Sequence, residues 1–171
     1  MQIEARLQSL GLALSAPPSF GPNIRLPFVP VRLRGNRAYI AGHAPLGPDG
    51  TLATPLGKVG VEVSVDEAYQ AARLTALAML GSLKRELGDL DRVTAWLRVF
   101  GMVNSTPDFT QQPSVINGFS DLILELYGEA GRHARSAVGM ASLPSNIPVE
   151  IEAEVEITVA QDGAAEEVTK P

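Results

Sequence analysis

The chain has 171 residues, of which 45% are apolar and 19% charged, which is enough apolar surface for one core rather than two. Its net charge of -5 and its lack of cysteine argue against non-specific nucleic-acid binding, disulfides, thiolate metal sites and cysteine nucleophiles. Because no apolar run approaches the roughly 18 to 20 residues that span a bilayer, we expect a soluble, cytoplasmic protein without an export signal.

The N-terminal segment predicts a short helix followed by an extended arm. Ile3, Leu7 and Leu10 follow helical spacing within residues 3–12, which favours an amphipathic helix packed on the domain as an appendage. Residues 16–30 then contain five prolines. Proline removes backbone donors and fixes φ, so an extended arm is favoured over regular structure there.

A hairpin and a long loop are expected next. Two short apolar runs, Val29–Leu33 and Ala38–Ala41, flank the pair Gly35-Asn36, the local signal of a tight hairpin turn. The glycine-rich stretch Gly42–Gly60 lacks apolar periodicity and is expected to be a loop. The end of this loop and the residues after it, Leu56–Val63, are a candidate for one extra short strand.

The middle of the chain predicts a helix, a strand and a second helix. Ser64 and Glu67 form a capping-box pattern before a helix over 66–87 that ends at Gly88. Its apolar stripe consists of Ala72, Ala76, Leu80, Leu83 and Leu87. Val93–Val103 alternates as a central strand does. The second helix is expected over Pro113–Glu129, with the apolar stripe Ile116, Phe119, Ile123 and Leu126 and a terminator at Gly131.

Two further strands complete the expected order β-β-α-β-α-β-β of an α+β fold. They span Ser136–Leu143 and Val149–Val159 and are joined by the turn Pro144-Ser145-Asn146. The domain plan is therefore a helix and arm over 1–27, one folded domain over 28–160 and a disordered tail over 161–171, which has few large apolar residues.

Several segments together resemble one known family. Residues 134–144 read ARSAVGMASLP and residues 149–153 read VEIEA, and both the motif and the spacing are similar to the signature of the YjgF/RidA family. Supporting segments are Gly35-Asn36, Gly88-Asp89-Leu90-Asp91-Arg92-Val93, and Asp108-Phe109 ahead of Asn117. The chain resembles a divergent subgroup of this endoribonuclease L-PSP-like and imine deaminase family, with an N-terminal extension.

The resemblance implies a chorismate-mutase-like fold, in which two helices pack on one face of a mixed sheet. It also implies a homotrimer with small-molecule pockets at the subunit interfaces, a carboxylate-bearing ligand and no metal or organic cofactor. Neither nucleic acid nor a membrane is expected as a partner. Consistent with this expectation, His43, His133, Asp91 and Asp108 show no short metal-ligand spacing.

The resemblance assigns catalytic roles to Arg135 and Glu150. The arginine would hold a substrate carboxylate with its rigid fork of donors. The glutamate would orient a water against an imine carbon, so that ammonia leaves and a 2-oxo acid forms. Each residue also has an ordinary explanation: Arg135 as a surface arginine at a strand start, and Glu150 as one of four glutamates on a solvated strand face.

Three expected pocket positions depart from the family pattern. Phe28 stands where the family often has tyrosine, Ala41 where it has serine, and His43 where it has glutamine. Asn117 matches a pocket-wall asparagine. His43 could act as an acid or base, or be a solvated loop histidine, and His133 could either extend an anion site or complement a helix dipole.

Three functions remain open from the sequence. The first is hydrolytic deamination of reactive 2-imino and 2-enamino acids. The second is a non-catalytic trimeric module that binds small carboxylates, favoured by the two missing hydroxyl groups, whose loss weakens polar substrate contacts. The third, an endoribonuclease or translation inhibitor, is disfavoured by the acidic balance of the chain.

Overall fold

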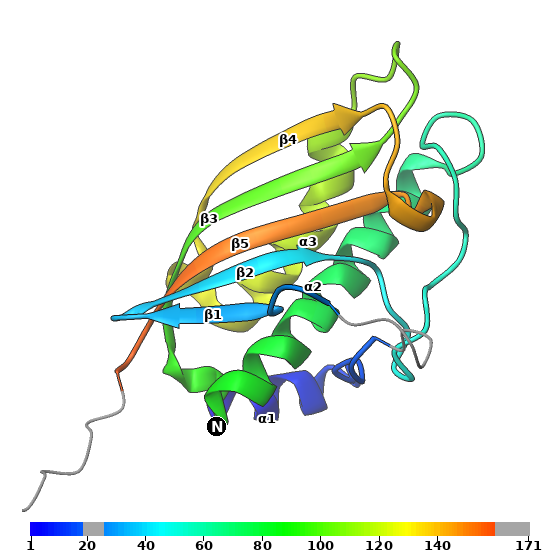
Figure 1. Cartoon of the computed structure of the whole chain (residues 1–171). Coiled ribbons are helices and arrows are strands. Elements are labelled where there is room, and N and C mark those ends of the chain that lie inside the picture. The colour runs from blue at the N-terminus through cyan, green and yellow to red at the C-terminus, as the bar shows by residue number, and fades with distance from the viewer. Residues whose placement is uncertain (19–25, 160–171) are drawn as a thin grey trace, which may run out of the picture.

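The architecture is a five-stranded mixed sheet with two long helices on one of its faces (Figure 1). The computed structural model describes residues 1–18 and 26–159. The strands lie in the order β1-β2-β5-β3-β4, and every neighbouring pair is antiparallel except β3 and β4, which are parallel. The strands are β1 (Val31–Arg34), β2 (Arg37–His43), β3 (Val93–Asn104), β4 (Ala134–Met140) and β5 (Val149–Ile157). The helices are α1 (Gln2–Ser9), α2 (Val65–Leu87) and α3 (Gln112–Tyr127).

The alternation in β5 separates the two faces of the sheet. Its valines, isoleucines and alanine are buried toward the helices, whereas its glutamates are only half-buried. Successive side chains of a strand point to opposite faces, so the glutamates lie on the face away from α2 and α3. The expected central position of β3 is confirmed, because it pairs with both β4 and β5.

The two long helices begin and pack as their sequences dictate. Ser64 and Glu67 form the expected capping box at the start of α2, and Gly88 ends that helix with a left-handed φ of 78°. A Cβ at Gly118 of α3 would overlap the backbone carbonyl of Tyr69 in α2. The absence of a side chain at Gly118 therefore allows the backbones of the two helices to approach closely.

Helix α1 packs against α3 and the turn Leu90–Arg92, and its residues Ile3 and Leu7 are buried. Its first backbone N–H groups donate to Asp91, from Gln2 at 2.6 Å and from Ile3 at 2.9 Å. A carboxylate at this position satisfies donors that the helix itself leaves free. The predicted N-terminal helix is thus present, although it ends at Ser9.

Some expected boundaries differ from the structure. The extra strand at Leu56–Val63 is wrong, because Val59 makes only isolated bridges to Val63 and Ser105 and the flanking glycines have positive φ. Strand β4 ends at Met140 rather than at residue 143. Part of the arm at 16–30 and the tail at 161–171 lie outside the described residues. In the described part of the chain, no helix has the length and apolar character needed to cross a membrane.

We expect Gly118→Ala to destabilise the fold by about 1 to 3 kcal/mol, the usual cost of overpacking a close contact. The added methyl group would force α3 away from the backbone of Tyr69. Urea unfolding followed by circular dichroism measures this, with Ser114→Ala, an exposed position on the same helix, as the control. Equal free energies of unfolding for both variants would contradict such tight helix packing.

Candidate active site at the end of the sheet

A cavity of about 670 Å³ lies where β2 and β5 meet the N-terminal arm. The arm, the end of β2, the following loop, α2 and the segment before β5 all contribute to its wall. The lining residues are Pro18, Leu26, Phe28, Pro30, Ala41, Gly42, His43, Ala44, Leu46, Gly50, Thr51, Leu52, Ser82, Pro144, Ser145, Ile147 and Glu150. Four residues expected at the site from the sequence, Phe28, Ala41, His43 and Glu150, are therefore brought together.

Glu150 is the only charged side chain among the described residues of this lining. It is half-buried and makes no hydrogen bond or ion pair with the residues that the structure describes. Burial raises the pKa of Glu150, and the neighbouring charge of Glu152 raises it further. Because its pKa is shifted toward neutrality, this carboxyl group is better suited to accept and release protons near neutral pH than the carboxyl group of an ordinary glutamate.

Gly42 provides the space that the Glu150 side chain occupies. A Cβ at Gly42 would overlap Oε1 of Glu150, so any other residue at this position would displace the carboxylate. Gly42 lies in an irregularity of β2, between the pairs Ile40 with Ala153 and His43 with Ile151. Irregularities of this kind re-aim side chains near functional sites.

His43 is buried and fully paired, so the alternative of a solvated loop histidine is wrong. Its Nδ1 lies 2.7 Å from the carbonyl oxygen of Ala41, and its Nε2 lies 2.8 Å from Oγ of Ser82. Because a carbonyl only accepts, Nδ1 carries the proton and Ser82 donates to Nε2. Arg85 in turn donates to Oγ of Ser82 at 3.0 Å. Both ring nitrogens are engaged, and His43 ties the end of β2 to α2.

Arg135 belongs to a different part of the chain surface. Its Nη1 donates to Oδ1 of Asn117 at 3.0 Å and to Oγ of Ser120 at 2.8 Å, and Nη2 donates to the carbonyl of Pro113 at 3.4 Å. Nε2 of His133 lies 3.0 Å from the same Ser120 hydroxyl. These partners are all neutral, so within the described chain the positive charge of Arg135 is not balanced by a contacting carboxylate.

The register across β3 places Arg135 and Glu150 on opposite faces of the sheet. Arg135 pairs with Val99, and Glu150 pairs with Met102. Val99 is buried under the helices, and the residue three positions further along a strand points to the opposite face. One copy of the chain therefore does not bring the two side chains into one site.

The sequence reasoning missed Ser82, Arg85 and Ser120. Ser82 and Ser120 are polar residues buried on otherwise apolar helix faces, and this mismatch is the signal that could have revealed them. Arg85 follows Ser82 by three residues and therefore lies on the same helix face.

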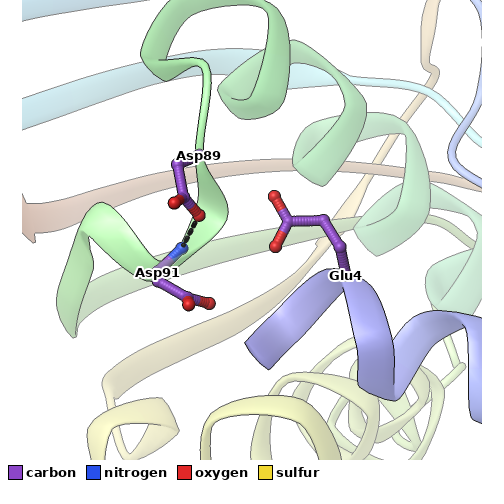
Figure 2. A group of neighbouring side chains, drawn as sticks. All are labelled: Glu4, Asp89 and Asp91. Carbon is purple, nitrogen blue, oxygen red and sulfur yellow. Dashed lines mark hydrogen bonds between the residues drawn. The ribbon is translucent and has the colours of Figure 1, made fainter. Parts of the chain in front are cut away.

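Three carboxylates at the other end of the molecule, Glu4, Asp89 and Asp91, also lie close together (Figure 2). Several of their oxygen atoms have structural partners, whereas Oε2 of Glu4 is buried without a hydrogen bond among the described residues. Glu4 accepts from Lys84 at 2.6 Å and from the backbone of Leu90 at 3.1 Å, while Asp91 accepts from the start of α1. These contacts attach α1 to the domain.

Acidification below about pH 6.5 should weaken the fold through His43, because that is the ordinary pKa of histidine. Burial lowers the pKa of His43, and the charge of Arg85 lowers it further. In this range the unfolded chain binds a proton that the folded chain does not, so the free energy of unfolding falls as the pH falls.

We expect urea titrations between pH 7 and pH 5 to show a shallower loss of stability for His43→Gln than for the wild type. Comparing the slopes of unfolding free energy against pH, rather than the free energies themselves, separates the effect of histidine protonation from the effect of the hydrogen bonds that the substitution removes. His133→Gln is a parallel test rather than a control: burial also lowers the pKa of His133, so this variant should show a shallower loss as well. Parallel curves for the wild type and His43→Gln would contradict the assignment.

Comparisons with known proteins agree with this fold. The sequence model described as "YjgF/chorismate mutase-like, putative endoribonuclease" matches residues 6–153. Protein TCP17 of Trypanosoma cruzi is 40% identical over 157 residues, which are 91% of this chain and 94% of that protein. The crystal structure of Atu1372 from Agrobacterium tumefaciens is 44% identical with a TM-score of 0.81, covering 92% of this chain and 94% of its own.

A more distant structure, E. coli TdcF with bound serine, shares the fold at 19% identity and a TM-score of 0.56, covering 84% of this chain and 94% of its own. The family match spans most of the chain, and two relatives are at least 40% identical over nearly their whole length. The chain therefore belongs to the YjgF/chorismate mutase-like family.

Proposed function

We propose that the protein hydrolyses reactive 2-imino and 2-enamino acids to 2-oxo acids and ammonia. The observation that carries this proposal is the Glu150 carboxylate, which is half-buried and unpaired within the described chain at the wall of a cavity. An unpaired acid with a raised pKa in a cleft is a candidate acid or base. Glu150 would position the attacking water, and Arg135 would hold the substrate carboxylate.

The proposed reaction needs only proton transfer and water. An enamine first tautomerises to the imine. Water then adds to the carbon of the protonated imine as Glu150 takes one of its protons, giving a neutral carbinolamine. Glu150 returns that proton to the nitrogen. The C–N bond then breaks while the carbinolamine hydroxyl group gives up its proton to the departing ammonia through the Glu150 carboxylate, so that ammonium leaves and the C–O bond becomes the carbonyl of the 2-oxo acid. A carboxyl group whose pKa lies nearer to neutrality serves these proton transfers.

Arg135 suits the carboxylate because its charge is not neutralised by its contacts. Its partners Asn117 and Ser120 are neutral, and a guanidinium binds a carboxylate with two parallel hydrogen bonds. Since Arg135 and Glu150 face opposite sides of one sheet, a site that contains both takes its arginine from a second copy. We therefore propose a homotrimer in which each site combines the cavity of one subunit with Arg135 of its neighbour.

A non-catalytic binding module is the second candidate. Phe28 and Ala41 line the cavity without the hydroxyl groups that the family pattern has there. Such a module would keep the same pocket and the same carboxylate ligand but lack turnover. The bound serine of E. coli TdcF supports a ligand of amino-acid size in this fold under either candidate. The endoribonuclease in the family description is less compatible with a net charge of -5.

Arg135→Ala and Glu150→Gln should each abolish deamination when prepared alone, because every site then lacks either its arginine or its glutamate. When the two variants are unfolded, mixed in equal amounts and refolded, about a quarter of the sites of a closed ring regain both intact residues. The measurement is loss of imine, generated by an amino-acid oxidase and trapped by semicarbazide.

The control for this experiment is each variant refolded alone, which should remain inactive. Light scattering of the mixture checks assembly. A monomeric protein, or a mixture without recovered activity from well-folded variants, would contradict a site shared between subunits.

Gly42→Ala should reduce kcat/KM strongly while leaving the fold intact. The new methyl group would displace the Glu150 carboxylate, and a misplacement of about 1 Å costs on the order of a hundredfold in rate. The assay is the same imine trap, with circular dichroism to confirm folding. Gly139→Ala on the edge strand β4 is a control for the general effect of adding a methyl group in the sheet, since its Cβ meets flexible side-chain atoms of Ser105 and Gln112. Unchanged activity in Gly42→Ala would show that the position of Glu150 is unimportant.

A further inference from the structure

We propose that the cavity selects 2-imino and 2-oxo acids that carry a large apolar side chain, branched aliphatic, thioether or aromatic, over those with small or polar side chains. The proposal rests on the function proposed above and names its substrate class. Its basis is the composition, pairing and size of the cavity wall.

The wall beyond Glu150 is apolar over most of its extent. The side chains that form it come from the arm, from the loop after β2 and from the segment before β5, three separate parts of the chain. They are Pro18, Leu26, Phe28, Pro30, Leu46, Leu52, Pro144 and Ile147. An apolar ligand side chain placed against them loses its contact with water, which favours binding in proportion to the area buried.

Three polar side chains of the wall, Thr51, Ser82 and His43, already have partners within the protein, whereas the hydroxyl group of Ser145 makes no hydrogen bond with the described residues. Thr51 donates its hydroxyl to Asp49 at 2.8 Å. Ser82 is engaged with both His43 and Arg85, and His43 uses both ring nitrogens. A polar ligand side chain would therefore give up water and find no free partner among Thr51, Ser82 and His43, and unmatched polar groups lower affinity.

The distribution of charge in the described lining also favours an apolar ligand side chain. Glu150 is its single charged side chain, and no lysine or arginine lies among the described lining residues. Because the proposed function uses the neighbour's Arg135 for the substrate carboxylate, an acidic ligand side chain would meet no further balancing cation among these residues, and a basic one would form an ion pair with Glu150 and hinder its proton transfers. An apolar side chain avoids both costs.

The volume of the cavity also exceeds the needs of a small acid. At about 670 Å³, it falls within the range of roughly 300 to 1,000 Å³ typical of pockets for larger small molecules. A three-carbon acid would leave much of the apolar wall uncovered. Because one methylene in an apolar pocket changes kcat/KM by about 10-fold or more, discrimination between side chains should be large.

The experiment compares imines that a D-amino-acid oxidase makes from alanine, serine, leucine, methionine and phenylalanine. We expect kcat/KM for the last three to exceed that for alanine by at least about tenfold. Leu52→Gln should reduce this ratio severalfold, because it places an amide in the apolar wall. Leu56→Gln is the matched control: the two leucines are 38% and 37% exposed, and Leu56 does not line the cavity.

Equilibrium binding separates this proposal from the proposed reaction. Calorimetry with 4-methyl-2-oxopentanoate and pyruvate should show tighter binding of the branched acid, and Leu52→Gln should reduce the difference severalfold. If no imine is consumed but this binding preference is found, deamination fails and the ligand class stands. If imines are consumed with equal or higher kcat/KM for alanine and serine, or if Leu52→Gln leaves selectivity unchanged, the ligand class is overturned while deamination stands.

Discussion

The pairing of β3 with both β4 and β5 is the constraint on which the organisation of the site depends. It fixes Arg135 opposite Val99 and Glu150 opposite Met102, and the pleat of a strand then places the two charged side chains on opposite faces. Each residue consequently acquires different surroundings. Arg135 is held by neutral oxygen atoms of α3, whereas Glu150 enters a cavity next to the N-terminal arm.

Features set by nearby residues could be predicted from the sequence. The capping box of Ser64 and Glu67, the left-handed end of α2 at Gly88 and the alternation of β5 depend on neighbours within a few positions. The grouping of Phe28, Ala41, His43 and Glu150 came from a motif resemblance, and the structure brings these four residues together.

Features set by distant partners could not be predicted. The environment of His43 depends on Ser82, 39 positions away, so a glycine-rich sequence context wrongly suggested a solvated loop. The opposite-face arrangement of Arg135 and Glu150 depends on the register across β3. A period-2 pattern is unchanged when a strand shifts by two residues, so alternation alone does not define that register. The role of Gly42 likewise depends on a side chain more than a hundred residues further along the chain.

The wall of the cavity is built largely from segments that are not part of the sheet. The arm is attached by its own contacts: Ser15 bonds to Leu46 and Arg85, and Ala16 bonds to Pro48. The Glu150 carboxylate, in contrast, lies on β5, between β2 and β3 in the sheet. With such a division, substitutions in the arm and the loop can change the shape and polarity of the cavity without altering the strands that position Glu150.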